Sequence, residues 1–408
     1  MESNLYPLHK LGDLLPKPYT NGLYKGMEFY GEGIRILRIN DFDTDGNLTS
    51  KEMEKVKLSE IEIKNYQLND RDIVINRVNS LTHLGKAILW EKKDNSPTVY
   101  ESNMMRIEHD ELVILPEFLI KVLHSEPTKA HFRKVAKRAV AQCSINQQDV
   151  KSLKVPLPSL LEQKKIVQIL QIWDEAIEKT QKLLFASTQQ KKALMYYLLS
   201  GKKRLLDEHG RRFNSAWDRH RLGTLLKEEK QRNKDNKISR VLSVTNRNGF
   251  VLPENQFSKR IASDEVSNYK VVRQGQFGYN PSRINVGSFD RLDQFENGLL
   301  SPMYVVFSIK SEKLDSNFFL YWMKSDEAKQ RINNSTQGSV RDSVGFDAIS
   351  GFVLKFPEPQ EQRKIAEVLS LAVQEIETLQ KKLDCLKQEK KALMQQLLTG
   401  KKRVKVAA

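Results

Sequence analysis

The stretches KKALMYYLLSGKKRL at residues 191–205 and KKALMQQLLTGKKRV at residues 390–404 share eleven of fifteen letters. The second stretch stands 199 residues after the first. Each runs from helix-forming residues through Ser-Gly or Thr-Gly into a run of cations, which is a signal for the end of a helix. The chain therefore contains two copies of one helix ending, and such a repeat guides how the rest is interpreted.

The repeat extends well upstream of this ending. PSLLEQKKIVQIL at residues 158–170 aligns with PEPQEQRKIAEVL at residues 357–369, again at an offset of 199. The match thus runs without a gap from Pro158 to Arg204 and from Pro357 to Arg403. Proline is tolerated at the start of a helix and glycine favours its end, so each copy is predicted to form one long helix.

Apolar residues recur every three or four positions in both copies, which is the heptad pattern of a coiled coil. In the second copy the positions are Ile365, Leu369, Ala372, Ile376, Leu379, Leu383, Leu386, Lys390, Leu393 and Leu397. In the first copy they are Ile166, Leu170, Trp173, Ile177, Thr180, Leu184, Ser187, Lys191, Leu194 and Leu198. The alternative is an amphipathic helix lying on a globular core. We favour two helices that pair with each other, as a rod of about 50 Å.

Lys191 and Lys390 interrupt the apolar stripe at equivalent places. We expect their aliphatic stems to cover apolar surface while their ammonium groups reach outward to water.

The segments before the two helices are more divergent, yet the same landmarks recur in the same order. HKLGDLL from residue 9 resembles HRLGTLL from residue 220, and RILRIND (35–41) parallels RVLSVTN (240–246). LNDRDIVINR (68–77) aligns with VRQGQFGYNP (272–281), and PEFLIKVLHS (116–125) with SNFFLYWMKS (316–325). We predict short strands with turns between them and helices near 116–140 and 316–333. The chain is thus a tandem duplication of a mixed α+β globule and a rod.

The composition indicates a polyanionic partner. The formal charge of +16 makes nucleic acid the first candidate and an anionic membrane surface the second. No apolar run is long enough to cross a bilayer, and the first ten residues lack the apolar core of a signal peptide. With only Cys143 and Cys385, no disulfide framework is implied, and we expect a cytoplasmic protein.

Motifs for catalysis are largely missing. The chain has no GxxxxGK[ST] phosphate loop, no GxSxG elbow, and no histidine in a CxxC or HExxH context, so neither an NTPase nor a metal site is indicated. GYNPS, from Gly278, resembles the Asn-Pro-Pro-aromatic loop of adenine methyltransferases. Its second proline and its aromatic residue are absent. An adenine methyltransferase-like enzyme using the Asn280 loop therefore remains an alternative, as does a coiled-coil scaffold whose basic surface is incidental.

Binding is what the remaining residues favour. Arg, Lys, Asn, Gln and Ser in predicted loops are the side chains that read base edges and hold phosphates. In the first half the candidates are Arg38, Asn40, Asp41, Asn76, Arg77, Asn79, Lys134, Arg138 and Gln142. In the second half they are Thr245, Asn246, Asn280, Arg283, Gln337, Ser339 and Arg341.

Over nearly its full length the chain resembles the specificity subunit of type I restriction–modification systems. The resemblance is most specific in the paired Pro-x-x-x-Glu-Gln-[Lys/Arg]-Lys-Ile motifs, at residues 158–166 and 357–365, and in the two KKALMxxLL[S/T]GKKR endings. The globules carry weaker landmarks, as the family implies, because different members read different DNA.

The resemblance implies an α+β fold in which two target recognition domains are separated by a long antiparallel coiled coil, in a pseudo-two-fold duplicated arrangement. The expected parts are the first recognition domain (1–157), the central helix (158–204), a linker (205–219), the second recognition domain (220–356), and the C-terminal helix with a basic tail (357–408). The chain itself would hold no cofactor and catalyse nothing. It would bind a bipartite target in double-stranded DNA.

The expected partners are two modification subunits, which carry out adenine methylation with S-adenosylmethionine, and restriction subunits that use ATP and magnesium. No membrane is involved on this interpretation.

Overall fold

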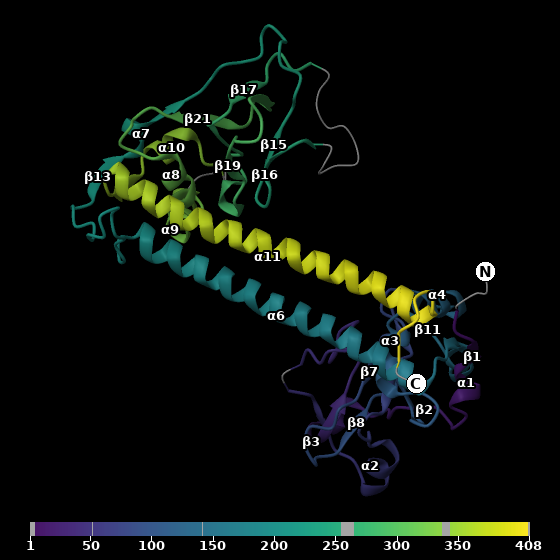
Figure 1. The fold of residues 1–408 in the computed structure, drawn as a ribbon. Helices are drawn as coiled ribbons and strands as arrows, with labels where there is room; N and C mark the ends of the chain where they lie inside the picture. Colours follow the sequence, from purple (N-terminus) through teal and green to yellow (C-terminus); the bar gives the residue numbers. More distant parts are fainter. Residues whose placement is uncertain (1–4, 51, 141, 254–264, 337–342, 407–408) are drawn as a thin grey trace. The chain divides into compact units, whose positions relative to one another are not determined.

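The computed structural model describes residues 5–50, 52–140, 142–253, 265–336 and 343–406 (Figure 1). The chain divides into two compact units. Unit 1 comprises residues 1–180 and 382–408, and unit 2 comprises residues 181–381. The candidates Gln337, Ser339 and Arg341 lie outside the described residues.

Unit 1 is built around a four-stranded antiparallel sheet in the order β2–β9–β5–β7. Smaller sheets are β1–β12, β4–β3–β8 and β10–β11–β6. The strands are β1 (Leu8–Lys10), β2 (Thr20–Asn21), β3 (Tyr30–Leu37), β4 (Lys55–Val56), β5 (Ile73–Asn76), β6 (Val78–Asn79), β7 (Ala87–Leu89), β8 (Thr98–Tyr100), β9 (Met104–Ile107), β10 (Lys137–Arg138), β11 (Cys143–Ser144) and β12 (Lys154–Pro156). The short helices are α1 (Leu11–Leu14), η1 (Met27–Phe29), α2 (Glu60–Tyr66), α3 (Pro116–Leu123), α4 (Glu126–Val135) and α5 (Gln147–Lys151).

Unit 2 repeats this plan with the sheet order β14–β21–β18–β19, all antiparallel, and the pair β13–β22. Its other two sheets are the pairs β15–β16 and β17–β20. The strands are β13 (Asp218–Arg221), β14 (Leu226–Glu228), β15 (Ser243–Thr245), β16 (Gly249–Val251), β17 (Lys270–Arg273), β18 (Phe277–Tyr279), β19 (Phe289–Arg291), β20 (Asn297–Leu300), β21 (Val305–Ile309) and β22 (Val353–Phe356). The short helices are α7 (Leu222–Leu225), η3 (Ile284–Val286), α8 (Ser316–Met323), α9 (Asp326–Thr336) and α10 (Phe346–Ser350).

The two central sheets share the same register as well as the same order. Ile73 in β5 stands opposite Ile107 and Leu89, and its counterpart Phe277 in β18 stands opposite Phe307 and Arg291. Side chains alternate between the faces of a strand, so each sheet packs on two clusters. Ile73 and Ile75 face the larger cluster of unit 1 while Val74 faces the smaller one. The tandem duplication expected from the landmarks is confirmed.

The two long helices are α6 (Leu160–Leu199) and α11 (Pro359–Thr399), within the predicted spans. Each stops where Gly201 and Gly400 adopt φ values of 71° and 80°. The Lys203 N–H then bonds the Tyr197 carbonyl at 3.0 Å, and the Lys402 N–H bonds that of Gln396 at 3.1 Å. This glycine turn satisfies carbonyls that a helix end leaves open, which is why both copies carry Ser-Gly or Thr-Gly followed by cations.

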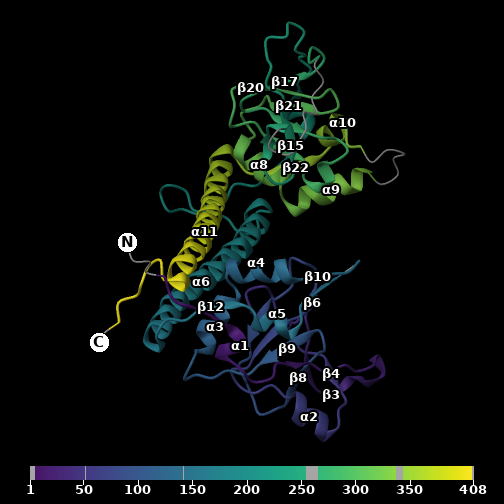
Figure 2. The same ribbon diagram turned by 90° about the vertical axis from the view of Figure 1, so that its right-hand side faces the viewer.

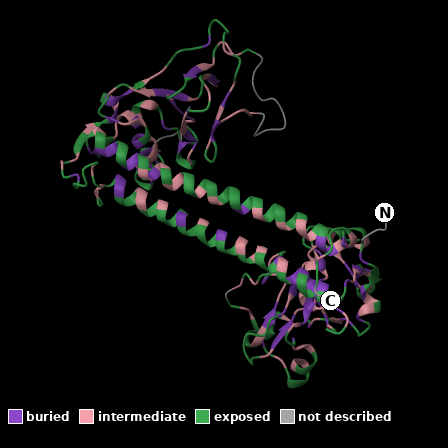
Figure 3. Ribbon diagram, viewed as in Figure 1, coloured by how far each residue is buried: buried purple, intermediate pink, exposed green. Residues whose placement is uncertain are grey.

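The heptad stripe is the covered face of both helices, since all twenty of its positions are buried or half-buried (Figure 3). The helix ends lie in the globular cores: Ile166, Leu170 and Leu397 belong to the main cluster of unit 1. Leu198, Ile365 and Leu369 belong to that of unit 2. Between these ends the two helices pack together, as where Ser187 donates to Glu375. The coiled-coil interpretation therefore holds for the middle of the helices, and the core-helix interpretation holds for their ends.

The expectation that Lys390 reaches outward is wrong. Its ammonium group pairs with Asp174, whose other oxygen lies 2.7 Å from Lys121 Nζ. Burial raises the pKa of Asp174, but the hydrogen bonds from the two lysines outweigh it and hold that pKa below its usual value. The half-buried Lys191 differs, because its charged neighbours are Lys324, Glu377 and Lys329. Burial and the two cations lower the Lys191 pKa.

Candidate nucleic-acid interface

The Glu-Gln pairs of the repeated motif attach each long helix to its globule. Gln163 is fully buried; its Oε1 accepts from the Leu115 N–H at 2.8 Å, and its Nε2 donates to the carbonyls of Pro158 and Val113 at 3.0 and 3.4 Å. In unit 2, Gln362 makes the same three bonds, with the Asp315 N–H and the carbonyls of Pro357 and Lys313. One buried amide in each unit thus joins a helix start to the loop before α3 or α8.

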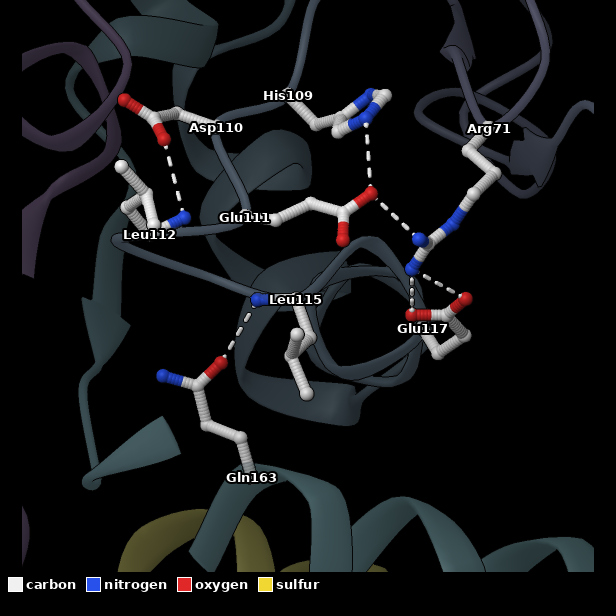
Figure 4. Close-up of polar contacts among 8 residues, drawn as sticks. All are labelled: Arg71, His109, Asp110, Glu111, Leu112, Leu115, Glu117 and Gln163. Carbon is white, nitrogen blue, oxygen red and sulfur yellow. Dashed lines mark hydrogen bonds and ion pairs between the residues drawn. The ribbon is translucent and has the colours of Figure 1, made fainter. Parts of the chain in front are cut away.

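Arg71 holds the same loop of unit 1 from the other side (Figure 4). Its guanidinium pairs with Glu111 and contacts both oxygens of Glu117 at 2.6 Å, while His109 Nε2 lies 3.4 Å from Glu111. Leu115 lies between this ion cluster and Gln163 (Figure 4). The loop is therefore held by polar contacts to the sheet side and to α6.

The preceding glutamates bind the arginines that end the helices. Arg204 donates to both oxygens of the fully buried Glu361 at 2.6 Å. Arg403 donates to Glu162 at 2.8 Å, and Tyr6 lies against the Arg403 guanidinium. In each unit the end of one helix thus binds the start of the other, so the helices pair antiparallel. Sequence reasoning missed these roles, although the recurrence of Glu-Gln and Gly-Lys-Lys-Arg at one offset was the available signal.

Of the three candidates in the loop after β3, only Asn40 is exposed. Asp41 is buried; it accepts from the Arg38 N–H at 2.7 Å and from Ser50 Oγ at 2.6 Å. Arg38 lies between Asp41 and Glu54, at 3.9 and 3.6 Å. The carboxylate of Asp41 is therefore used to fold its own loop.

The candidates that follow β5 are mostly covered. Asn76 is fully buried, and no described group hydrogen-bonds its side-chain amide. Arg77 donates to the Ser102 carbonyl at 3.2 Å, and Asn79 accepts from the Ser80 N–H at 2.7 Å. Lys86 links this group to the previous loop, because its backbone carbonyl accepts from the Asn76 N–H and its ammonium donates to the Phe42 carbonyl.

The third group of unit 1 stands on α4 and the β10–β11 hairpin. Lys134, Arg138 and Gln142 are all exposed. β11 pairs with β6, which places Cys143 opposite Asn79. The structure thus brings all three candidate groups of unit 1 to one region around the end of β5.

Unit 2 joins its two described candidate groups in the same way. Ser288 Oγ donates to the Val244 carbonyl at 2.7 Å, which ties the loop after β18 to the β15–β16 hairpin. Asn246 and Arg283 are exposed there. Thr245 accepts from the Asn248 N–H at 3.0 Å, and Asn280 accepts from that of Ser282 at 3.0 Å. The Asn280 side-chain oxygen thus stabilises its own turn.

Among the described residues, no group of three or more His, Cys, Asp or Glu side chains could hold a metal ion. Within the same residues, no helix is both long and apolar enough to cross a membrane.

Comparison with known proteins agrees with this architecture. The family model described as the type I restriction modification DNA specificity domain matches residues 9–184 and 289–388. The chain is 26% identical, over 425 aligned positions, to the putative type I restriction enzyme MjaX specificity subunit of Methanocaldococcus jannaschii, covering 98% of this chain and 94% of that protein.

Solved structures share the fold. The crystal structure of the type I restriction–modification S subunit from M. genitalium superposes with a TM-score of 0.58 at 15% identity, covering 98% of this chain and 97% of that one. A chain from a study of complex assembly in a type I system superposes with a TM-score of 0.55 at 14% identity, covering 97% of this chain and 98% of that one. The two matched family domains, the duplicated sheets and the paired helices agree: this chain belongs to the type I restriction–modification specificity subunits, the non-catalytic components that recognise DNA and direct the complex.

Proposed function

We propose that the chain reads a bipartite target in double-stranded DNA, with one half-site recognised by each unit. The observation that carries the proposal is the pair of sheets with one order and one register, each bearing a different set of exposed side chains. Arg138 and Gln142 are exposed in unit 1, and Asn246 and Arg283 in unit 2. A duplicated scaffold with divergent loops suits an asymmetric, two-part sequence.

On this proposal residues 1–157 and 220–356 are the target recognition domains, and 158–204 and 357–408 are the helical spacer, joined to the second domain through 205–219. Within that joining segment, Asp207 forms a turn with Arg211, and Ser215 accepts from Arg204 at 3.0 Å. The long helices would set the distance between half-sites. The net charge of +16 would provide the salt-sensitive attraction to phosphates.

The chemistry would come from partners. Two modification subunits, docked on the repeated helical motifs, would methylate adenine with S-adenosylmethionine, and restriction subunits would use ATP and magnesium. The near-identity of the two helix endings supports two copies of one partner, because equivalent surfaces bind equivalent molecules. The complex would act in the cytoplasm.

The test is methylation profiling of DNA from cells that express the full chain with its partner subunits. We expect a motif of two short blocks separated by a spacer of fixed length. Arg283→Ala should alter one block and leave the other unchanged. A single continuous motif, or a motif that Arg283→Ala alters in both blocks, would contradict the proposal. Binding of S-adenosylmethionine by the chain alone would instead support a methyltransferase.

A further inference from the structure

Residues 137–144 of unit 1 form a hairpin. Strands β10 and β11 pair antiparallel, with Arg138 opposite Cys143, and the Ala139 N–H bonds the Gln142 carbonyl at 2.9 Å. β11 also pairs with β6, so Arg138, Cys143 and Asn79 lie side by side across three strands. The Ile145 N–H bonds the Arg77 carbonyl at 2.9 Å, which anchors the hairpin to the chain leaving β5. Figure 2 shows β10 at the edge of unit 1, at the end away from α2.

The hairpin is exposed and basic. Lys137, Arg138, Ala139, Val140 and Gln142 are all exposed, and Val140 is open to solvent over its whole side chain, at 110%. Residues 127–148 contain five Lys or Arg and no Asp or Glu. One of the five, Arg133, pairs with Glu126 just before this stretch. The remaining positive surface, with small apolar side chains at its tip, suits an anionic partner that has a groove.

Exposure also separates the hairpin from the other candidates of unit 1 except Asn40. Asp41 and Asn76 are buried, and Arg38, Arg77 and Asn79 are half-buried with bonds inside the unit. Four of the nine candidates are exposed, and three of these, Lys134, Arg138 and Gln142, stand on the hairpin or on α4 just before it.

β6 pairs with β11 only as far as Cys143, so beyond Arg138 and Cys143 the hairpin continues as two arms. A two-stranded antiparallel ribbon has the dimensions of the major groove of B-DNA. Its strands lie about 4.8 Å apart, and the groove is about 12 Å wide. Within the groove, arginine can bind guanine O6 and N7 together, glutamine can bind adenine N6 and N7, and an apolar side chain can contact the thymine methyl group. Arg138, Gln142 and Val140 supply one side chain of each kind.

We propose that the β10–β11 hairpin is the element of unit 1 that enters the major groove. Arg138 and Gln142 contact base edges, Val140 packs against a base from the tip, and Lys134 and Lys137 contact the flanking phosphates. This assignment rests on the proposed function, and it names the part of unit 1 that determines the sequence of its half-site.

The test compares four single variants of the full chain, each in the complex with its partner subunits. Arg138→Ala should weaken cognate binding about 5- to 150-fold, the discrimination of one bidentate contact, and should relax one position of one block. Arg138→Lys keeps the charge but loses the two parallel N–H donors of the guanidinium, so it should relax the base preference at the same position. Lys137→Ala should weaken all sequences alike and reduce the salt slope by about 1. Lys64→Ala, on exposed α2, is the matched control and should change neither the recognised sequence nor the salt slope.

The readouts are methylation profiling and DNA binding over a series of salt concentrations. If Arg138→Ala and Arg138→Lys leave both blocks unchanged while wild type keeps a two-block motif, the hairpin assignment is wrong and the proposed function survives. If wild type shows no two-block motif, the proposed function itself fails. Because the substituted side chains are exposed, unchanged far-UV circular dichroism should accompany every variant.

Discussion

Arg204→Ala is predicted to destabilise the start of α11 far more than the equivalent change, Arg403→Ala, destabilises the start of α6. The Glu361 carboxylate is fully buried, and among the described residues its hydrogen bonds all come from Arg204. Removing the guanidinium leaves a buried charge without a partner, which costs about 3–5 kcal/mol.

The equivalent carboxylate is better supplied with partners. Glu162 also accepts from the Ser159 N–H at 3.1 Å, from Ser159 Oγ at 3.0 Å and from Tyr6 at 3.4 Å. The Arg403 side chain is 49% exposed, whereas that of Arg204 is 19% exposed. Water can therefore replace much of what Arg403→Ala removes, and we expect a much smaller loss than for Arg204→Ala.

Hydrogen exchange by mass spectrometry measures both sites in the full chain. If the amides at the start of α11 exchange through local opening, Arg204→Ala should speed them about 150- to 5,000-fold, since 1.4 kcal/mol is a factor of ten. Arg403→Ala should speed the amides at the start of α6 by a much smaller factor, because water replaces the lost contact. The double variant Arg204→Ala, Glu361→Leu should recover much of the protection, because it removes the orphaned charge.

Equal effects of the two alanine variants would refute the argument from burial. A double variant as unprotected as Arg204→Ala would show that the orphaned carboxylate is not the source of the cost.

Three further predictions concern the long helices. Lys191→Leu should stabilise unit 2 by about 1 kcal/mol in urea unfolding, because the half-buried lysine has two cationic neighbours, Lys324 and Lys329, and one acidic neighbour, Glu377. Lys390→Leu should instead destabilise unit 1 by about 1–2 kcal/mol, because it breaks the contact with Asp174; changes of the same sign would contradict this. Gln163→Ala and Gln362→Ala should each cost about 3 kcal/mol, since each removes the partner of a part-buried N–H and of two carbonyls. A cost below about 1 kcal/mol in either unit would argue against this. Because the pKa of Asp174 is depressed in the folded state, its contribution to stability is complete above the ordinary carboxyl pKa of about 4 and disappears as the pH falls through the folded pKa. The difference in unfolding free energy between wild type and Asp174→Asn, measured from pH 7 to pH 2, should therefore narrow at the acid end. A constant difference would show that Asp174 titrates alike in the folded and unfolded states.

Much of the architecture could be read from local chemistry. The offset of 199 residues identified the duplication, and the Gly-Lys-Lys-Arg endings marked where α6 and α11 stop, because only a glycine accepts that left-handed turn without strain. The heptad stripe predicted the covered face at every one of its positions. Such features depend on residues close together in the chain, so a periodic pattern reveals them.

The candidate interface was only partly accessible to this reasoning. Asn76 and Arg138 are both polar residues beside predicted turns, yet one is fully buried and the other exposed. Asp41 carries the charge and position of a loop residue, but it folds its own loop through the Arg38 N–H and Ser50. Sequence pattern cannot separate these cases, because exposure depends on which distant strands cover a turn.

The sequence by itself therefore determined that this protein is a duplicated pair of globules and heptad helices with an excess of positive charge. Tertiary structure decided which polar groups meet: Lys390 with Asp174, Arg204 with Glu361, and Gln163 with the loop before α3. Those partners are 48 to 216 residues apart. Sequence periodicity indicates which residues prefer burial. The partner of a buried polar group is decided only when distant segments pack together, because a charge left unpaired in the interior is costly.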